Sequence, residues 1–154
     1  MVEQQKKKHI VCVGGGHCNC QVLKALKMQL SPEETHLTLV TEAPKSYYSG
    51  MLPGAVSGLY SDTDLQVDLE PLAKWCRADY VEKRVAKVVG NENKLVMEDG
   101  SELAYDVLVL NVGSKTRGAK EVQGVWEHSL TTRPINDLLP KIASKEQEFV
   151  QASR

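Results

Sequence analysis

The 154-residue sequence contains no apolar run near the roughly 20 residues that a membrane-spanning helix requires. It also has almost no net charge, because 19 Lys and Arg residues are balanced by 20 Asp and Glu residues, which gives −1. Without an excess of positive charge, the chain has no long-range attraction for nucleic acid or for an anionic membrane. We therefore expect a globular domain with no transmembrane segment and no nucleic-acid partner.

The four cysteines also lack a metal-binding pattern. Cys12, Cys18, Cys20 and Cys76 contain no C-x2-C pair, so we predict no metal site. The apolar stretch Ile10–Val13 is ended at once by glycines and is too short for the core of a signal peptide. We expect a cytoplasmic protein, with an organelle as the alternative, whose thiols stay reduced.

The first forty residues are typical of a strand–helix–strand unit. His9–Val13 is a short apolar run that three glycines end, which predicts a buried strand, and Leu37–Val40 predicts a second one. Between these runs, residues recur at helical spacing on one face: Asn19, Val22, Leu23, Leu26 and Leu30. A unit of this kind is right-handed and its two strands are parallel.

Residues 43–62 differ from the rest because prolines and glycines interrupt them repeatedly. We predict a long apolar loop without regular elements, of the kind that lines a ligand cavity. After it, Leu69, Leu72, Ala73 and Cys76 form the apolar stripe of another helix.

From Asp79 the hydrophobic period changes to two, which predicts a β-meander of short antiparallel strands. These strands are Tyr80–Val89, Lys94–Glu98 and Glu102–Tyr105, with a hairpin turn at Asp99-Gly100. Asp106–Val112 is then continuously apolar, the pattern of a parallel strand buried on both faces. The polar composition of residues 134–154 predicts a helical tail with a break at Pro140.

Together these patterns predict an α/β fold in which a Rossmann-like parallel sheet with helices carries a small antiparallel β-meander. We divide the chain into a nucleotide-binding domain, residues 1–133, and a helical tail, residues 134–154.

Gly14-x-Gly16-x-x-Asn19 follows a predicted strand and opens a predicted helix, which is the context of a dinucleotide-binding turn. Backbone N–H groups at the helix start would hold a pyrophosphate, and the helix dipole would assist them. Asn19 replaces the third glycine, and we expect its bulk to hold the helix slightly away from the strand. Thr41 and Glu42 end the second strand, where a ribose-binding carboxylate is expected. The alternatives are a plain strand–helix turn and a Glu42 that is only a solvated charge.

Four stretches resemble the FAD-dependent pyridine nucleotide-disulfide oxidoreductases, nearest the NADH-dehydrogenase-like flavoproteins and the module fused to selenide, water dikinase. They are V-C-V-G-G-G-H (11–17), Y-S-G-M-L-P-G-A-V-S-G (48–58), Y-D-V-L-V-L-N-V-G-S (105–114) and T-R-P-I-N-D-L (132–138). They occur in the family's order and match its N-terminal part, and the second stretch is the most specific.

The resemblance implies an FAD site with a role for each matching position. The pyrophosphate would be held by Gly14, Gly15, Gly16, His17 and Cys18. The adenosine ribose would meet Thr41 and Glu42, and the adenine would meet the backbone of Val85. The isoalloxazine would be bordered by Ser49, Gly50, Met51 and Pro53. The turn that closes over the cofactor would be Asn111, Val112 and Gly113, where the family has Ala-Thr-Gly.

Two family features do not occur in the sequence. No C-x4-C pair follows the first helix, so disulfide-relay chemistry is excluded, and no second glycine motif marks an NAD(P)H domain. The resemblance therefore implies the FAD-binding N-terminal portion of an NAD(P)H-dependent oxidoreductase, with no catalytic residue assigned. NAD(P)H would act only with the remainder of the enzyme, a possible partner. The alternatives are a truncated, non-catalytic nucleotide-binding or scaffold domain and a Rossmann subdomain that binds NAD alone.

Overall fold

The computed structural model describes residues 6–118 and 121–153. The chain forms two compact units, each considered by itself below. The first unit contains Met1–Ser46 and Val67–Val112, and the second contains Tyr47–Gln66 and Gly113–Arg154.

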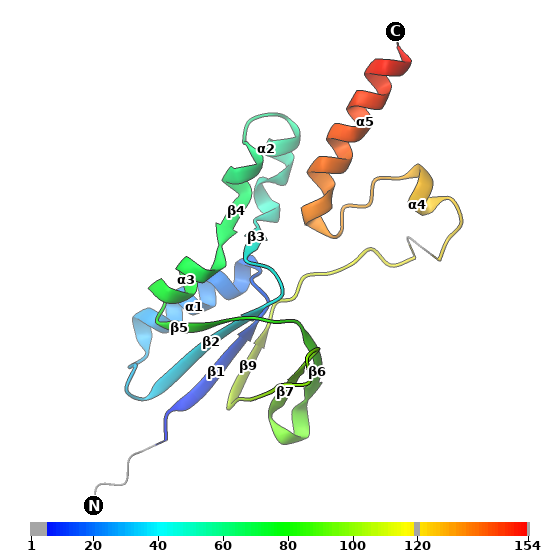
Figure 1. The fold of residues 1–154 in the computed structure, drawn as a ribbon. Helices are drawn as coiled ribbons and strands as arrows, with labels where there is room; N and C mark the ends of the chain where they lie inside the picture. The colour runs from blue at the N-terminus through cyan, green and yellow to red at the C-terminus, as the bar shows by residue number, and fades with distance from the viewer. Residues whose placement is uncertain (1–5, 119–120, 154) are drawn as a thin grey trace, which may run out of the picture. The chain divides into compact units, whose positions relative to one another are not determined.

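The first unit is built on a four-stranded parallel sheet (Figure 1). Its strands, in spatial order, are β5 (Ala78–Glu82), β2 (Thr35–Thr41), β1 (Lys8–Val13) and β9 (Val107–Leu110). The parallel pairing of β1 with β2 and with β9 confirms the predicted α/β fold. The central place of β1 explains why its sequence is continuously apolar.

The two faces of this sheet contribute to two separate cores. Ile10 and Cys12 belong to a cluster formed with helix α1 (His17–Gln29) and helix α3 (Leu69–Trp75). Val11 and Val13 instead contact buried residues of the meander. Because successive side chains of a strand point to opposite faces, β1 joins a helical layer to a β layer.

The meander consists of β6 (Val85–Val89), β7 (Lys94–Met97) and β8 (Glu102–Ala104), which pair antiparallel as predicted. A short 3-10 helix, η3 (Gly90–Glu92), joins the first two strands. Gly100 has a φ of +80°, so the predicted hairpin turn at Asp99-Gly100 is confirmed.

The prediction of one antiparallel strand over Tyr80–Val89 is wrong. Its first residues belong to β5, which pairs parallel with β2. Strand β5 lies at an edge of the sheet, where Ala78 is buried and Asp79 is exposed. A parallel edge strand with one exposed face shows the same alternation as an antiparallel strand.

The prediction that Asp106–Val112 is buried on both faces is also wrong. Strand β9 covers only Val107–Leu110 and is the other edge of the four-stranded sheet. Val107 is 46% exposed and Leu110 is 55% exposed. An apolar run predicts a strand, but it does not determine which neighbours cover that strand.

The second unit contains several short helices and one longer helix. Residues 43–62 are not an irregular loop, because they contain 3-10 helix η1 (Ser49–Met51) and helix α2 (Leu52–Val56). Pro53 lies in the first turn of α2, where no backbone N–H is needed, and this is why the prediction failed. The same cause applies to Pro140, which lies in the first turn of helix α5 (Leu138–Ala152) and does not break it.

The remaining elements of the second unit are 3-10 helix η2 (Asp62–Leu65), helix α4 (Val125–His128) and 3-10 helix η4 (Ile135–Asp137). Strands β3 (Lys45–Tyr47) and β4 (Gln66–Asp68) form a two-stranded sheet at the points where the chain passes from one unit to the other.

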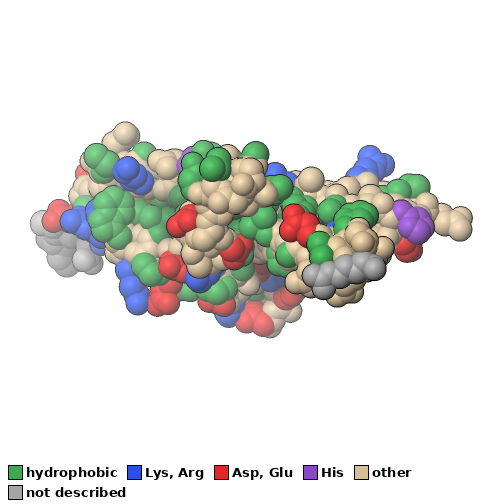
Figure 2. All heavy atoms as spheres, turned by 90° about the horizontal axis from the view of Figure 1, so that it is seen from above, with side chains coloured by type: hydrophobic (Ala, Val, Ile, Leu, Met, Phe, Trp, Pro, Cys, Tyr) green, Lys and Arg blue, Asp and Glu red, His purple; other side chains and the backbone are tan. Residues whose placement is uncertain are grey.

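Within residues 6–118 and 121–153, none of the helices is long and apolar enough to cross a membrane. Figure 2 shows one face of the molecule, on which basic and acidic side chains are interspersed.

Candidate functional site

In the turn between β1 and α1, a side chain at any of the three glycines would overlap neighbouring atoms. Gly14 has a φ of +87°, and a Cβ atom there would overlap the Asn111 carbonyl group. A Cβ atom on Gly15 would overlap Leu69, and one on Gly16 would overlap the Asn111 side chain. The turn therefore brings bare backbone to the carboxyl end of the parallel sheet, where α/β folds bind ligands.

The carbonyl groups of this turn already have hydrogen-bond partners. Asn19 Nδ2 donates to the Val13 oxygen at 3.0 Å and to the Gly14 oxygen at 2.8 Å. The Cys20 thiol donates to the Gly15 oxygen at 3.5 Å, and burial raises the pKa of this thiol, which keeps it protonated. The Cys20 N–H donates to the Gly16 oxygen at 3.1 Å.

Unlike the carbonyl groups, several N–H groups of the same turn have no hydrogen-bond partner among the described residues. Those of Gly15, Gly16 and Cys18 form no hydrogen bond with any residue in the described part of the chain. Gly16 is the N-cap of α1, and no side chain at that position caps the helix. A turn with paired carbonyls and unpaired N–H groups at a helix N-terminus is polarised to bind an anion.

Asn19 does not hold α1 away from the strand, as its bulk predicted. It is fully buried, and its two amide hydrogen bonds fasten the first turn of the helix to the end of β1. Its Oδ1 atom is buried without a partner among the described residues. Sequence reasoning missed this anchoring role, for which the only signal was a polar residue on the apolar face of a helix.

Thr41 is the last residue of β2, the strand beside β1, and Glu42 follows it, but both side chains already have partners. The buried Thr41 hydroxyl donates to the Ala43 carbonyl at 3.1 Å. The exposed Glu42 carboxylate pairs with Arg84 at 3.1 Å, and Arg84 also pairs with Glu98 at 3.2 Å. Since exposed ion pairs contribute about 0–1 kcal/mol, Glu42 could exchange Arg84 for a ribose hydroxyl at little cost.

The remaining predicted residues of the first unit lie in two places, at the start of β6 and directly after β9. Val85 begins β6 opposite Met97, next to an irregularity in the register. Asn111 follows β9, and its N–H donates to the Val13 carbonyl at 2.8 Å. Val112 is 68% exposed. The first unit thus brings Asn111, but not Val85, into contact with the glycine turn.

The other predicted site residues belong to the second unit. Ser49, Gly50 and Met51 form η1, Pro53 lies in α2, and Gly113 has a φ of +74°. A Cβ atom on Gly50 would lie 2.7 Å from the Tyr48 ring, so a side chain at position 50 would displace this ring.

The segment around η1 is held together by its own side chains. The Tyr47 hydroxyl donates to Asp62 at 3.2 Å and accepts from Gln66 at 3.0 Å. Burial raises the pKa of Tyr47, and the nearby Asp62 carboxylate adds to this effect.

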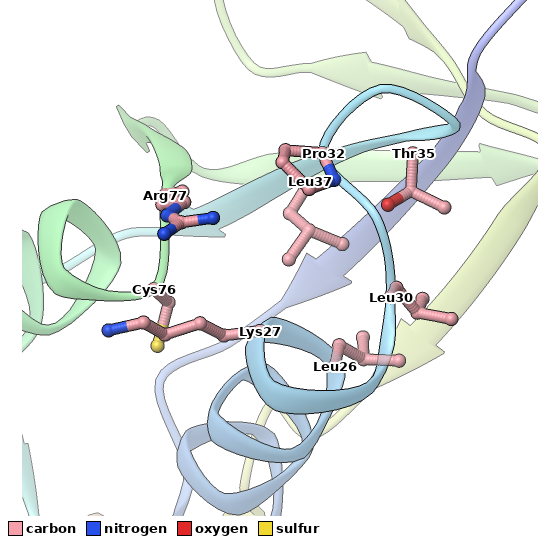
Figure 3. A pocket seen from close by; sticks show the side chains of 8 residues that line it. All are labelled: Leu26, Lys27, Leu30, Pro32, Thr35, Leu37, Cys76 and Arg77. Carbon is pink, nitrogen blue, oxygen red and sulfur yellow. The ribbon is translucent and has the colours of Figure 1, made fainter.

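A hollow in the first unit lies away from the glycine turn. Figure 3 shows it beside the last turn of α1, and its lining is Leu26, Lys27, Leu30, Pro32, Thr35, Leu37, Cys76 and Arg77. It encloses about 20 Å³, which is room for roughly one water molecule. This hollow is too small for a nucleotide and contains none of the predicted site residues.

Comparison with known proteins finds relatives named type II NADH:quinone oxidoreductase. The chain is 27% identical over 153 residues to the type II NADH:quinone oxidoreductase of Staphylococcus saprophyticus, covering 94% of this chain and 38% of that protein. It is 25% identical over 127 residues to the protein of the same name from Staphylococcus aureus, covering 81% and 31%. The chain thus spans less than two fifths of the length of these relatives. No family model matches it.

Solved structures show the same fold. The sulfide:quinone oxidoreductase of Aquifex aeolicus matches with a TM-score of 0.75 and 21% identity, over 93% of this chain and 32% of that one. NDH2 of Plasmodium falciparum matches with a TM-score of 0.66 and 19% identity, over 89% and 28%. At these identities the solved structures show the fold alone, and they confirm the predicted α/β fold. The predicted resemblance to NADH-dehydrogenase-like oxidoreductases agrees with the names of the relatives.

Proposed function

We propose that this chain is the FAD-binding portion of an NADH-dehydrogenase-like oxidoreductase. The observation that carries the proposal is the polarity of the glycine turn, whose unpaired N–H groups stand at the start of α1. The likeness to type II NADH:quinone oxidoreductases supplies the class of reaction. In such an enzyme, bound FAD would accept hydride equivalents from a nicotinamide and pass electrons on to an acceptor.

The residues present fit the pyrophosphate of FAD. Gly16 and Cys18 offer unpaired N–H groups, and the crowding around Gly14 and Gly15 leaves only backbone near that position. Because phosphate oxygens accept several hydrogen bonds, they would satisfy donors that nothing else in the described chain satisfies. His17, at the first position of α1, would contribute its N–H to the same group.

The other contacts are proposed on the resemblance. Glu42 would hold the adenosine ribose in exchange for Arg84, with Thr41 shaping the turn beside it, and the Val85 backbone would meet adenine. The isoalloxazine would be bordered by Ser49, Gly50, Met51 and Pro53, and the closing turn would be Asn111, Val112 and Gly113.

We further propose that residues 134–154 lead toward a nicotinamide-binding part of the enzyme. NAD(P)H would then be a ligand of that part of the enzyme, not of residues 1–154. We also propose a cytoplasmic location, with which the four free cysteine thiols are compatible.

Titration of the purified chain with FAD, followed by quenching of flavin fluorescence and by calorimetry, tests this proposal. We expect saturable binding to one site, with FAD preferred to NAD. The variant Gly16→Ala should bind FAD at least 10-fold more weakly, because its Cβ atom displaces the Asn111 side chain and blocks the approach to the turn.

Gly90→Ala is the matched control, because a Cβ atom on Gly90 would meet open space. This variant should bind FAD like the wild type, and both variants should give the wild-type circular dichroism spectrum. Unchanged affinity in a folded Gly16→Ala variant would move the site elsewhere. Tighter binding of NAD than FAD would favour a simple dinucleotide-binding domain.

A further inference from the structure

Two asparagines from distant parts of the chain meet at the end of β1. Asn19, on α1, and Asn111, after β9, both donate to the carbonyl of Val13, at 3.0 Å from Asn19 Nδ2 and 2.8 Å from the Asn111 N–H. The Asn19 N–H in turn points to Asn111 Oδ1 at 3.4 Å. We call this pair the asparagine clasp. It joins the helix, the central strand and the edge strand at the glycine turn.

Within the clasp, Asn111 takes over a function that the helix's own N-cap cannot perform. Gly16 has no side chain with which to cap α1. Asn111 Oδ1 occupies the space over Gly16 and accepts from the third residue of the helix, which is the usual geometry of a capping side chain. The oxygen of the Asn111 amide is therefore committed to the helix.

The nitrogen of that amide has no such partner. Asn111 Nδ2 forms no hydrogen bond with any residue that the structure describes. It belongs to the same planar group as Oδ1, so it lies close to the unpaired N–H groups of the glycine turn, Gly16 included. Asn111 thus places an additional uncharged donor among the donors of a turn that is polarised for an anion.

We propose that the Asn111 side chain contacts the ligand and donates from Nδ2 to a phosphate oxygen of the dinucleotide, while its Oδ1 caps α1. This inference rests on the proposed function and adds to it a side-chain contact to the pyrophosphate. The resemblance implied only a closing turn at this position. The contact also assigns a use to the polar residue that directly follows the apolar strand β9.

The alternative is that Asn111 only caps the helix, and Asn111→Asp and Asn111→Ala together separate the two roles. Aspartate keeps the oxygen that caps α1, and a negative charge at a helix N-terminus is favourable, so the melting temperature without ligand should stay equal or rise. The carboxylate has no donor and repels phosphate, so affinity should fall at least 10-fold. Because that repulsion would act beside a pure cap too, Asn111→Ala, which removes the donor without adding charge, decides: a pure cap loses stability in this variant but keeps its affinity, whereas a ligand contact loses both.

The experiment compares the full chain with Asn111→Asp, Asn111→Ala and the control Asn91→Asp, which makes the same charge change at an exposed residue of the meander. Calorimetry measures binding of FAD and of ADP, and thermal unfolding measures stability. We expect Asn111→Asp to be more stable than Asn111→Ala but to bind both ligands more weakly. Asn91→Asp should behave like the wild type.

The following results would overturn the inference. Wild-type affinity in Asn111→Ala or in Asn111→Asp, or tighter binding by Asn111→Asp than by Asn111→Ala, would leave Asn111 as a cap alone. A loss for FAD but not for ADP would place Asn111 away from the pyrophosphate. If the wild-type chain binds neither FAD nor ADP, the proposed function itself fails, and this inference fails with it.

Discussion

Asn19→Asp should destabilise the protein strongly, although an acidic residue in the first turn of a helix is usually favourable by about 0.3–1 kcal/mol. Asn19 is fully buried, and both of its amide hydrogens are donated to carbonyl oxygens, at 2.8 and 3.0 Å. A carboxylate has no hydrogen to donate and would place a negative charge against those two oxygens. The local geometry therefore reverses the general rule.

The magnitude follows from a comparison with Asn19→Ala. Alanine removes two hydrogen bonds, at about 1 kcal/mol each, and should cost about 2 kcal/mol. Aspartate adds an uncompensated buried charge, which raises the loss to about 3–5 kcal/mol at pH 7. Because burial favours the neutral carboxyl group and the protonated form can donate once, Asn19→Asp should recover part of this loss at pH 5.

Urea unfolding followed by circular dichroism at pH 7 and pH 5 measures these differences. We expect the order of stability at pH 7 to be wild type, Asn19→Ala, Asn19→Asp. An Asn19→Asp variant as stable as Asn19→Ala at pH 7 would show that Asn19 is not buried against the two carbonyls, and the description of the turn would be wrong.

Burial, followed by the charge of His36, lowers the pKa of His9 below its ordinary value of 6.5. As pH falls below about 6.5, the His9 side chain is therefore protonated more readily in the unfolded chain, and the free energy of unfolding should decrease. The urea midpoint between pH 8 and pH 5 measures this decrease, which should be smaller in His9→Gln. Leu23→Ala should cost about 2–5 kcal/mol in the same assay, since Leu23 is fully buried between α1 and the sheet, and a smaller loss would place it outside the core. Gly14→Ala should prevent soluble expression, because it adds strain at positive φ to an overlap with the Asn111 carbonyl, and a folded variant would contradict the turn geometry. With FAD added, the chain should oxidise NADH no faster than free FAD does, as measured at 340 nm, because it has no second glycine motif to orient a nicotinamide.

The centre of the sheet could be predicted from sequence because β1 is covered on both faces, and its continuous apolar run reports that directly. The edges could not be predicted in the same way. Strand β5 alternates although it is parallel, and β9 is continuously apolar although Val107 and Leu110 are exposed. A sequence pattern reports the average environment of a strand and does not identify its neighbours.

The prolines were misjudged for a local reason. Pro53 and Pro140 both lie in the first turn of a helix, where the missing N–H costs nothing. Locating that turn requires knowing where each helix begins, and helix ends are the least certain part of any prediction from sequence.

The candidate site shows the same division between local and distant information. The glycines of the turn were predicted because their spacing, and the strand and helix that flank them, lie within a few residues. The hydrogen bonds of Asn19 could not be predicted, because one of its partners, Asn111, is 92 residues away in the sequence. Likewise, nothing near Glu42 in the sequence indicates that Arg84 would pair with it.

The strand order also has a consequence for how the protein is made. Strand β1 leaves the ribosome well before β9, which is one of its two neighbours in the sheet. His9 and the Asp106 side chain that binds its N–H are separated by 97 residues. At roughly 5–20 residues per second, the edge of β1 that receives β9 would stay unpaired for about 5–20 s during synthesis. Val11 and Val13 would be exposed over that interval, so a nascent chain that stalls before residue 107 should be a substrate for chaperones.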